Sequence, residues 1–410
     1  MPYTLIQRQS CRICQSQDVR RFLHFDTMPF TDGFVSNHKL GSEFLAPLDL
    51  YWCAGCKTTQ TLHDVEVSDY YREYRYTVSD SPFARNFMEK LAQSVFTRYG
   101  LGTGDTVIEI GSGDGNQLAC FRELGARVLG FEPSAELTKY SRAVGVPVVQ
   151  RLFGPTTVAE IPEAMQPVQV VILTYTFDHL PNPVEFLRAL HSIIDRERGV
   201  LVIEVHDLQK IMERCETCLF EHEHAVYLNL LTMKRLLERE GFKLLTADLV
   251  PEQERRGNSL LIAAACNESK YGSVPDVDNP SLTAMDEWQT FEEFGRSVDE
   301  SRSRLQDYVR NRTLQGKRIA GYGAGGRGVM TIAQADFDRK DIVYLCDRNP
   351  SFQGLYTPRS HIPVVPPEHL LVDPVDELIV FSFGYMDEIR QQLAEYLARG
   401  GHLVSLLDLL

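Results

Sequence analysis

The stretch Val107-Ile-Glu-Ile-Gly-Ser-Gly-Asp-Gly-Asn-Gln-Leu118 decides how the central part of this chain folds. Apolar, strand-compatible residues lead directly into a turn that carries three glycines, Gly111, Gly113 and Gly115. A glycine-rich turn after a parallel strand lets backbone N–H groups approach a ligand, because no Cβ stands in the way. The next predicted strand ends at Glu132, about 20 residues after Gly113, where a carboxylate binds ribose hydroxyls in nucleotide-binding α/β folds.

The same residues, written Glu109-x-Gly-x-Gly-x-Gly115, resemble motif I of class I S-adenosylmethionine (SAM) methyltransferases. The glycine spacing differs from the Gly-x-Gly-x-x-Gly of dinucleotide sites, although such a site and a plain glycine turn stay as alternatives. The resemblance implies that the loop contacts the amino acid part of SAM, Glu132 its ribose and Phe153 its adenine. The implied cofactor-binding residues are Glu109, Gly111, Gly113, Asp114, Glu132 and Phe153.

Residues 101–250 alternate between strand-like and helix-like segments. The predicted strands cover 106–110, 126–131, 168–174 and 198–205, and the predicted helices cover 134–143, 183–195 and 231–240. Alternation at this spacing indicates a parallel sheet with helices on both faces, so the fold class is α/β. A strand near 259–265 is expected to complete the sheet in antiparallel orientation. The glycine turn then lies at the carboxyl end of the first strand, where ligands bind in such sheets.

Two short cysteine pairs, Cys11-Arg-Ile-Cys14 and Cys53-Ala-Gly-Cys56, lie near the start of the chain. Two residues between the thiols let a turn place both on one cation, and four thiolates select Zn²⁺ in a closed tetrahedral site. We therefore expect structural zinc on Cys11, Cys14, Cys53 and Cys56, with reduced core cysteines as the alternative. The long spacer between the pairs implies an insertion that folds between them.

The composition is that of a soluble globular protein, because 43% of the 410 residues are hydrophobic and 24% are charged. A formal net charge of −14 argues against broad nucleic-acid binding, which needs a basic surface. The sequence shows neither a signal-peptide pattern nor an apolar run long enough to span a membrane. We expect a cytoplasmic protein with a small-molecule substrate, without nucleic-acid or membrane partners, as a monomer or small homo-oligomer.

Two further strings place ionisable side chains near strand ends. Thr174-Tyr-Thr-Phe-Asp-His179 follows the third predicted strand, so His179 is expected to face the cofactor cleft. Phe220-Glu-His-Glu-His224 alternates acids and imidazoles, which would be costly in a core without partners. A carboxylate beside an imidazole raises its basicity and orients it, so this string predicts a general base. Metal binding by His222 and His224, or a solvated loop, are the alternatives.

A second glycine loop, Gly321-Tyr-Gly-Ala-Gly-Gly326, follows a predicted strand and opens a helix. The strand after it ends in an acid, Asp347. By itself this pattern is typical of a dinucleotide site. It also suits the diphosphate of a nucleotide-linked substrate, held at the helix N-terminus with added charge from Arg327. Later strands at 377–382 and 402–406 are expected to continue a parallel sheet.

Together, the order of these parts resembles the sugar C-methyltransferases of deoxysugar pathways, which make branched sugars of antibiotics. The residues that carry the resemblance are Cys11-Arg-x-Cys14, Tyr76, Glu109-x-Gly-x-Gly, Glu132-Pro-Ser, His179, His222-Glu-His224, Gly321-Tyr-Gly-Ala, Asp347-Arg-Asn-Pro350 and His361-Ile-Pro363. The resemblance implies a zinc-binding module at 1–65, a class I SAM methyltransferase domain at 66–270, and a Rossmann-like nucleotide-sugar-binding domain at 271–410. The last domain would begin with a linking helix at 283–310.

The resemblance also implies a chemistry. A general base removes a proton beside the ketone of a dTDP-linked keto-deoxysugar, and the enolate carbon attacks the methyl group of SAM. His224 would be the base, with Glu223 as its orienting partner or as a sugar contact. Tyr76 and His179 would contact the hydroxyl or the oxyanion, and His222 completes the implied catalytic set. The implied substrate contacts are Glu221, Tyr175, Gly323, Gly326, Arg327 and Asp347. This step requires neither a metal nor a nicotinamide.

Three positions depart from the family pattern. Glu221 stands where the family usually has Tyr, Tyr175 where it has Asn, and Phe383-Gly-Tyr385 where it often has Trp-Asn. All three are on the substrate side, so methyl transfer to oxygen or nitrogen is an alternative. A nicotinamide-linked oxidoreductase that uses the second glycine loop is another, as is a zinc-anchored binding protein without enzymatic activity.

Overall fold

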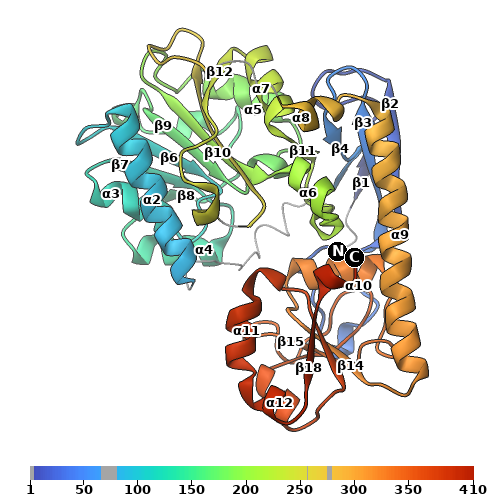
Figure 1. The fold of residues 1–410 in the computed structure, drawn as a ribbon. Helices are drawn as coiled ribbons and strands as arrows, with labels where there is room; N and C mark the ends of the chain where they lie inside the picture. The colour runs from blue at the N-terminus through green and yellow to red at the C-terminus, as the bar shows by residue number, and fades with distance from the viewer. Residues whose placement is uncertain (1–3, 66–80, 256, 275–278) are drawn as a thin grey trace.

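The computed structural model describes residues 4–65, 81–255, 257–274 and 279–410. Figure 1 shows a central α/β domain, an N-terminal β-rich module beside it and a C-terminal α/β domain below both. A long helix, α9 (Trp288–Leu314), runs along one side of the molecule from the N-terminal module to the C-terminal domain. None of the helices in the described ranges combines the length and the apolar character needed to span a lipid bilayer.

The N-terminal module is built on a long antiparallel hairpin. Its strands are β1 (Leu5–Gln7), β2 (Val19–Met28), β3 (Ala46–Cys53), β4 (Thr59–Gln60) and β5 (His63–Val65). β2 pairs with β3 and β3 with β4, while β1 and β5 form a separate pair. Alternate residues of β3 are buried (Leu48, Leu50 and Trp52), as in a strand with one face on a core. The insertion expected between the cysteine pairs is the segment between β2 and β3.

The sheet of this module takes its fourth strand from the central domain. β11 (Val226–Tyr227) pairs antiparallel with β4, which places Val226 opposite Gln60 and Tyr227 opposite Thr59. The strand order is therefore β11-β4-β3-β2. β11 begins two residues after His224. The pairing therefore holds residues 221–224, the acid–imidazole string, against the module.

The central sheet has seven strands in the order β12-β13-β10-β9-β6-β7-β8. They are β6 (Thr106–Ile110), β7 (Arg127–Phe131), β8 (Val148–Val149), β9 (Val170–Thr174), β10 (Val200–His206), β12 (Phe242–Thr246) and β13 (Ser259–Cys266). The strands from β10 to β8 are parallel, and β13 is antiparallel to both of its neighbours. The predicted parallel sheet and its antiparallel completion are confirmed.

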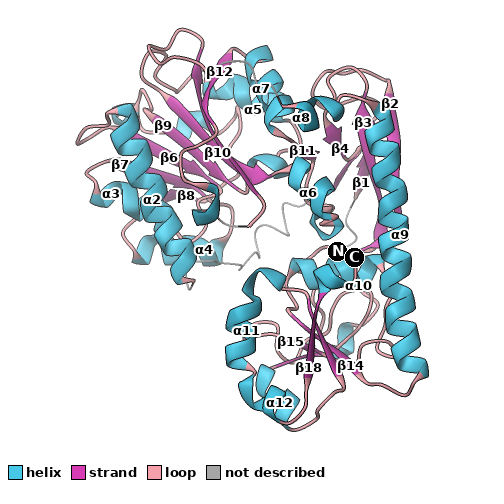
Figure 2. Cartoon of the chain, viewed as in Figure 1, coloured by secondary structure: helices cyan, strands magenta, loops and turns pink. Residues whose placement is uncertain are grey.

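Helices cover both faces of the central sheet (Figure 2). They are α2 (Pro82–Tyr99), α3 (Asn116–Glu123), α4 (Ala135–Ala143), α5 (Pro183–Leu190) and α7 (Leu230–Arg239). A further helix, α6 (Leu208–Arg214), lies at the junction with the N-terminal module, where Leu208 and Ile211 join a core with residues of β2 and β3. Because side chains alternate along a strand, Ile108 faces one core with α5, while Val107 faces the other core with α2. Both faces of β6 are buried, which explains why apolar residues, Val107 and Ile108, point to opposite faces of this strand.

The helix expected at 183–195 is shorter than predicted. α5 ends at Leu190, and the following residues turn back along the sheet. The Val168 N–H donates to the Ile193 carbonyl at 2.8 Å, and Val168 forms a parallel bridge with Ile194. Ile193 and Ile194 are buried in this turn. A buried turn and a helical face give the same apolar spacing, so only the tertiary contact decides where this helix ends.

The C-terminal domain has a fully parallel five-stranded sheet in the order β16-β15-β14-β17-β18, as predicted. The strands are β14 (Ile319–Tyr322), β15 (Leu345–Cys346), β16 (Val364–Val365), β17 (Glu377–Val380) and β18 (His402–Ser405). The helices of this domain are α10 (Gly326–Gln334), α11 (Met386–Gln392) and α12 (Ala394–Ala398). α10 lies at the junction with the rest of the molecule (Figure 1).

The helix α9, which follows the short α8 (Pro280–Ala284), links two bodies of the structure as predicted. In its first half Phe291 and Phe294 are buried in one core with residues of β2, and the Phe291 ring centroid lies 5.1 Å from that of Phe22. In its second half Leu305 and Val309 enter the core of the C-terminal domain. Packing at both ends makes α9 a strut between the N-terminal module and the C-terminal domain.

Gly295 marks the closest approach of α9 to β2. A Cβ at this position would lie 2.6 Å from the backbone oxygen of Phe22, which cannot move aside as a flexible side chain can. We expect Gly295→Ala to lower the free energy of unfolding by about 1–3 kcal/mol in urea denaturation. Arg296→Ala, on the exposed face, should change it by less than about 0.5 kcal/mol. Equal stability of Gly295→Ala and the wild type would contradict this close packing.

Candidate active site

The glycine turn after β6 combines a tight backbone with an open side. Gly111 and Gly113 have φ values of +70° and +54°, which favour glycine. A Cβ on Gly111 would lie 2.4 Å from Thr176 Oγ1, so a larger residue would displace the turn after β9. A Cβ on Gly113 would meet no described atom within 4 Å. A ligand can therefore lie against the backbone at Gly113, as sites at the carboxyl ends of parallel strands require.

Glu132 closes this turn from the end of β7. Its carboxylate accepts hydrogen bonds from the backbone N–H groups of Gly113 at 3.0 Å and Ser134 at 2.7 Å. The residue is 5% exposed. Burial raises the pKa of Glu132 to about 7, although these two N–H groups act to lower it. The predicted ribose-binding acid therefore lies beside the glycine turn and titrates near neutral pH.

Two other predicted cofactor residues lie on either side of the turn. Glu109 is buried in β6, and its carboxylate accepts a hydrogen bond from Thr174 Oγ1 at 3.3 Å. Asp114 accepts a hydrogen bond from the backbone N–H of Asn116 at 3.1 Å, at the start of α3. Asp114 thus supports the backbone at the end of the turn, whereas Glu109 links β6 to the end of β9.

Phe153, the predicted adenine contact, is buried in an aromatic cluster. Its ring packs edge-to-face against Phe131 at 5.0 Å and Phe186 at 5.4 Å. The neighbouring Leu152 is 53% exposed. Leu152 therefore presents more apolar surface at this end of the sheet than Phe153 does.

Three imidazoles and one carboxylate meet near the ends of the neighbouring strands. His179 ends the short 3-10 helix η4 (Phe177–His179) after β9, His206 ends β10, and His224 comes from the loop before β11. The ring centroid of His224 lies 4.6 Å from that of His179 and 5.3 Å from that of His206. Asp178 lies among them, with Oδ2 3.4 Å from His206 Nδ1. The structure thus brings together two predicted residues, His179 and His224.

The tautomer of His224 is set by the backbone. Its Nδ1 lies 3.1 Å from the carbonyl oxygen of Leu219, and because a carbonyl only accepts hydrogen bonds, Nδ1 carries the proton. The lone pair is therefore on Nε2. Glu221 Oε2 lies 3.7 Å from this nitrogen, which is beyond hydrogen-bond distance. His224 is 3% exposed, and its Nε2 can act as a base in a site that excludes most water.

The acids around His224 are protonated more readily than usual. Burial, and then the neighbouring Glu223, raises the pKa of Glu221 well above its usual range. Glu223 accepts hydrogen bonds at Oε1 from Thr31 N at 3.1 Å and Thr31 Oγ1 at 3.0 Å, and burial raises its pKa as well. Burial, assisted by Glu223, raises the pKa of Asp32 to about 7. Burial thus acts against the charged form of each of these three carboxyl groups.

Among the imidazoles next to Asp178, burial lowers pKa values instead of raising them. Burial lowers the pKa of His179 to about 3, and the adjacent His224 acts in the same direction. Burial also lowers the pKa of His206. Burial works to raise the pKa of Asp178, but the neighbouring His224 and His206 outweigh it, and its pKa is held below the usual range. An ionised carboxylate thus lies among imidazoles.

His222 does not join this cluster. Its Nε2 lies 3.2 Å from the carbonyl oxygen of Met28, its Nδ1 lies 2.9 Å from His63 Nε2, and its ring packs edge-to-face against Phe44. Burial lowers the pKa of His222 to about 3. Both ring nitrogens face the N-terminal module, so the structure does not bring His222 together with His224, and its catalytic role stays a prediction. The two residues are separated because the chain turns between them.

The four cysteines of the N-terminal module form a compact set of donors. Sγ atoms lie 3.5 Å apart in the pairs Cys11–Cys56 and Cys14–Cys53, and all four lie within 4.8 Å of one another. Thiolates bound to one tetrahedral zinc at its usual bond length would be about 3.8 Å apart. Gln60 Nε2 also donates a hydrogen bond to Cys11 Sγ at 3.0 Å. The donor set fits a closed structural Zn²⁺ site, as the sequence predicted.

This module holds both loops of the candidate site. Arg12 is buried and donates a hydrogen bond to the carbonyl of Pro181 at 2.8 Å, two residues after His179. The same guanidinium pairs with Asp64 at 2.9 Å. The pairing of β11 with β4 holds the other loop, which contains His224. The module that carries the cysteines would therefore influence the chemistry by holding these two loops in place.

The second glycine loop faces the site from the C-terminal domain. Gly323 has a φ of +99°, and a Cβ there would lie 2.2 Å from Ser382 Oγ. Asp347 Oδ2 accepts a hydrogen bond from Ala324 N at 2.7 Å, as Glu132 does in the first loop. A Cβ on Gly326 would lie 3.5 Å from Glu221 Oε1. The N-terminus of α10 therefore touches the acid–imidazole string.

The remaining predicted substrate residues lie at the same junction. The guanidinium of Arg327 stacks on Phe383 at 4.8 Å, and its Nη1 lies 3.7 Å from Glu216 Oε1. Tyr175 has a φ of +50°, and its ring centroid lies 4.7 Å from that of His206. Tyr76, a predicted catalytic residue, lies outside the described residues.

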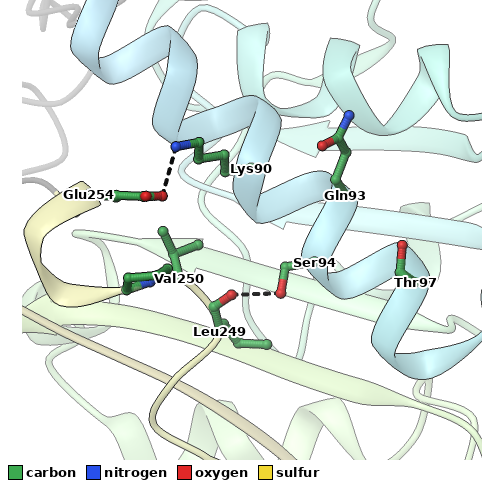
Figure 3. A pocket seen from close by; sticks show the side chains of 8 residues that line it. Lys90, Gln93, Ser94, Thr97, Leu249, Val250 and Glu254 are labelled. Carbon is green, nitrogen blue, oxygen red and sulfur yellow. Dashed lines mark hydrogen bonds and ion pairs between the residues drawn. The ribbon is translucent and has the colours of Figure 1, made fainter.

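A surface hollow of about 340 Å³ lies away from these groups, between α2 and the segment after β12 (Figure 3). Lys90 pairs with Glu254 at 2.7 Å at one end of it, and Ser94 donates to the Leu249 carbonyl at 2.6 Å. Its lining holds neither imidazole nor thiol. The groups suited to proton transfer lie instead at the strand ends.

Three family models match the chain in sequence order. They are described as "Putative zinc binding domain" (residues 11–71), "Methyltransferase domain" (residues 83–247) and "C-methyltransferase C-terminal domain" (residues 259–407). The C-methyltransferase NovU of Streptomyces niveus is 27% identical over 402 residues, which are 96% of this chain and 94% of that protein. The chain is therefore similar to this C-methyltransferase over nearly its whole length. It is a SAM-dependent methyltransferase with a zinc-binding module, as the sequence predicted.

Solved methyltransferase structures align with a part of this chain. The plantazolicin methyltransferase BpumL in complex with SAH is 16% identical, with a TM-score of 0.36, over 46% of this chain and 86% of that one. The magnesium protoporphyrin IX methyltransferase ChlM of Synechocystis PCC 6803 with bound SAH is 14% identical, with a TM-score of 0.37, over 49% of this chain and 98% of that one.

The structure adds residues to the site that the sequence analysis missed. Asp178 follows β9 and His206 ends β10. Because ligands bind at the carboxyl ends of parallel strands, their positions in the sequence could have indicated both residues. Thr31 and Asp32 come from the insertion between β2 and β3. No local pattern distinguishes these two residues, because only the docking of the N-terminal module brings them to Glu223.

Loss of zinc should abolish activity without abolishing SAM binding. We expect Cys14→Ser to reduce the zinc content from about one ion per chain to near zero and the Tm by about 5–15 °C, because a closed zinc site supports the fold directly. Methyl transfer should be lost because the His224 loop depends on this module, whereas SAM binding by calorimetry should persist. Cys120→Ser, a free cysteine outside the cluster, is the matched control. Full activity of zinc-free protein would contradict the structural role.

SAM affinity should depend on the ionisation of Glu132. A ribose hydroxyl donates better to a carboxylate than to a carboxylic acid. Because the pKa of Glu132 is raised to about 7, the group is mostly ionised at pH 8 and mostly protonated at pH 6. We expect calorimetry to show about tenfold weaker SAM binding at pH 6 than at pH 8. Glu132→Gln should bind weakly at both, whereas Glu136→Gln on α4 should behave like the wild type. A flat wild-type profile would contradict this role of Glu132.

Proposed function

We propose that this methyltransferase transfers the methyl group of SAM to a carbon beside the ketone of a nucleotide-linked keto-deoxysugar, with dTDP as the nucleotide. The observation that carries the proposal is His224, a buried imidazole of defined tautomer near the ends of the central strands and next to the second glycine loop. The similarity to NovU, which is named a C-methyltransferase, supports carbon as the methyl acceptor.

Proton removal is the first step in this proposal. A C–H bond beside a ketone loses its proton to a base within hydrogen-bond reach. His224 Nε2 would accept this proton, and the electron pair of the C–H bond would pass into the enolate. SAM supplies an electrophilic methyl group, whose bond to sulfur breaks as the enolate carbon attacks. The sugar gains one C–C bond, and the base later returns its proton to solvent.

His179 is the described residue best placed to stabilise the enolate oxygen. Its ring stands edge-on to His224, with the two ring planes at 82°. Because burial lowers its pKa to about 3, His179 is neutral and has a single N–H, which would have to turn from the backbone of Glu223 to the enolate oxygen. A single donor to a developing oxyanion is worth about 10²–10³ in rate. Tyr76, by the family resemblance, would supply a second donor.

Glu223 suits the sugar better than the base. One of its oxygens holds Thr31, and Oε2 is buried without a hydrogen-bond partner among the described residues. A buried polar atom without a partner is costly, and a substrate hydroxyl would satisfy it. Glu221, whose pKa burial raises, would donate a hydrogen bond where the family usually has a tyrosine.

The nucleotide would bind at the second glycine loop. The N-terminus of α10 offers backbone N–H groups and a favourable dipole to a diphosphate, and Arg327 adds a positive charge. The sugar would then lie between Gly326 and His224, which are both close to Glu221. Asp347 would contact the nucleotide ribose. In this scheme residues 66–270 bind SAM and residues 271–410 bind the nucleotide.

The proposal is tested with methyl-deuterated SAM and a panel of dTDP-linked 4-keto-deoxysugars in D₂O, with products read by mass spectrometry and NMR. We expect a labelled methyl on carbon, and exchange of solvent deuterium at the same carbon when SAM is left out. His224→Ala should lower both rates by about 10²–10⁴-fold, the usual contribution of a general base, with SAM binding retained. His402→Ala, exposed on β18, is the control.

The alternatives give different products. A labelled methyl on oxygen or nitrogen would exclude the enolate, and transfer to none of the sugars by a protein that binds SAM would exclude this substrate class. A change of NADH fluorescence on titration would favour the nicotinamide-linked oxidoreductase. Unchanged transfer by His224→Ala would remove the base on which the proposal depends.

A further inference from the structure

Asp178 is a buried acid that the proposed mechanism does not use. It is 3% exposed and lies at the centre of the imidazole cluster. Oδ2 lies 3.4 Å from His206 Nδ1, and Oδ1 has no hydrogen-bond partner among the described residues. A buried carboxylate so weakly compensated is costly unless it meets a positive charge in some state of the protein. The arrangement therefore calls for a cation nearby.

The imidazolium of His224 would be that cation. The ligand atoms of Asp178, His179 and His224 all lie within 4.8 Å of one another. The backbone carbonyl of Asp178 accepts a hydrogen bond from the N–H of Ala225 at 2.7 Å, which ties the residue after the base to this turn. Opposite charges at such distances attract strongly where little water screens them.

The acids of the string itself are less suited to this role. Glu223 is held by Thr31 through Oε1. Glu221 has Oε2 3.7 Å from His224 Nε2, but its burial beside Glu223 disfavours the charged form. Neither acid offers a stable negative charge to the base. Asp178 does, because its pKa is held below the usual range.

We infer that Asp178 is the counterion and positioning residue of the base: its carboxylate stabilises the imidazolium that forms when His224 accepts the substrate proton, and His206 holds that carboxylate in place. The inference rests on the proposed function. The proton moves from the sugar carbon to His224 Nε2, and Asp178 stays ionised throughout. One positive and one negative charge are created in the step, the imidazolium and the enolate, and the carboxylate is adjacent to the first.

Several other charged groups face this pair and bear on its pH dependence. They are His179 from η4, His206 from β10, Glu221 and Glu223 from the acid–imidazole string, Asp32 from the N-terminal module and Arg327 from α10. Burial raises the pKa of each of these three acids. Among the acids near His224, Asp178 is therefore the one best suited to be ionised when the base is protonated.

The test is the pH dependence of kcat/KM in Asp178→Asn, with the panel sugar that the wild type methylates. A base works when it is deprotonated, so the rate falls on the acidic side. Without the carboxylate the imidazolium is less stable, and the acidic limb should move down by about one pH unit. The plateau should fall about 10–100-fold, because a weaker base removes the proton more slowly. SAM binding should not change.

Two isosteric variants serve as controls. Glu223→Gln changes one of the two acids of the string, and Asp207→Asn changes a buried carboxylate that caps α6 one residue after His206. Neither should move the acidic limb. If Asp178→Asn lowers the rate equally at every pH and leaves the acidic limb of the profile unmoved, Asp178 has only a folding role. If Glu223→Gln moves the acidic limb, Glu223 is the counterion. Either result overturns the inference.

A second measurement separates this inference from the proposed substrate. In full-length protein with ¹³C-labelled histidine, the NMR signal identified by its loss in His224→Asn should titrate at lower pH in Asp178→Asn than in the wild type. This shift is expected even if no panel sugar is methylated, so failure of the substrate class and failure of the counterion are distinguishable. An unmoved signal would overturn the inference. So would a second metal ion per chain that Asp178→Asn releases, because Asp178 would then be a ligand.

Discussion

The pairing of β11 with β4 is the contact on which the architecture of the site depends. Val226 lies opposite Gln60, and the Gln60 side chain donates a hydrogen bond to the sulfur of Cys11. The chain that leads into this strand carries His224. The two residue pairs between β11 and β4 therefore connect the zinc-binding module to the loop of the candidate base. The cysteine cluster that fits zinc therefore lies in the same module as the strand that pairs next to the His224 loop.

Burial sorts the ionisable groups of the site into two kinds. Near Asp178, burial lowers the pKa of His179, whereas the surrounding imidazoles lower the pKa of Asp178 and so favour its carboxylate form. Around Glu221 burial and the mutual repulsion of neighbouring acids both raise the pKa of the carboxyl group. A neutral base next to one fixed negative charge and several hydrogen-bond donors suits a reaction that separates charge. Three bodies of the structure supply these groups.

Much of the fold could be predicted because its signals are local. The glycine turn, Glu132 and the cysteine pairs each follow from a few adjacent residues, and the alternation of strands and helices gave the parallel sheets. The length of α5 could not be predicted, because the buried turn after it has the same apolar spacing as a helix. His222 and His224 are two residues apart, yet only His224 reaches the strand ends. The roles assigned to His224, Glu223 and His179 stay predictions.

The sequence by itself determined the fold class, the zinc-binding donor set and the SAM-dependent methyltransferase character, because backbone turns and ligand spacing depend on neighbours in the chain. Only the tertiary structure decided which side chains share the site. Thr31 comes to Glu223 from the N-terminal module, and Gly326 comes to Glu221 from the C-terminal domain. Such contacts depend on how separate bodies dock, and docking depends on whole surfaces and a long strut rather than on any short pattern of residues.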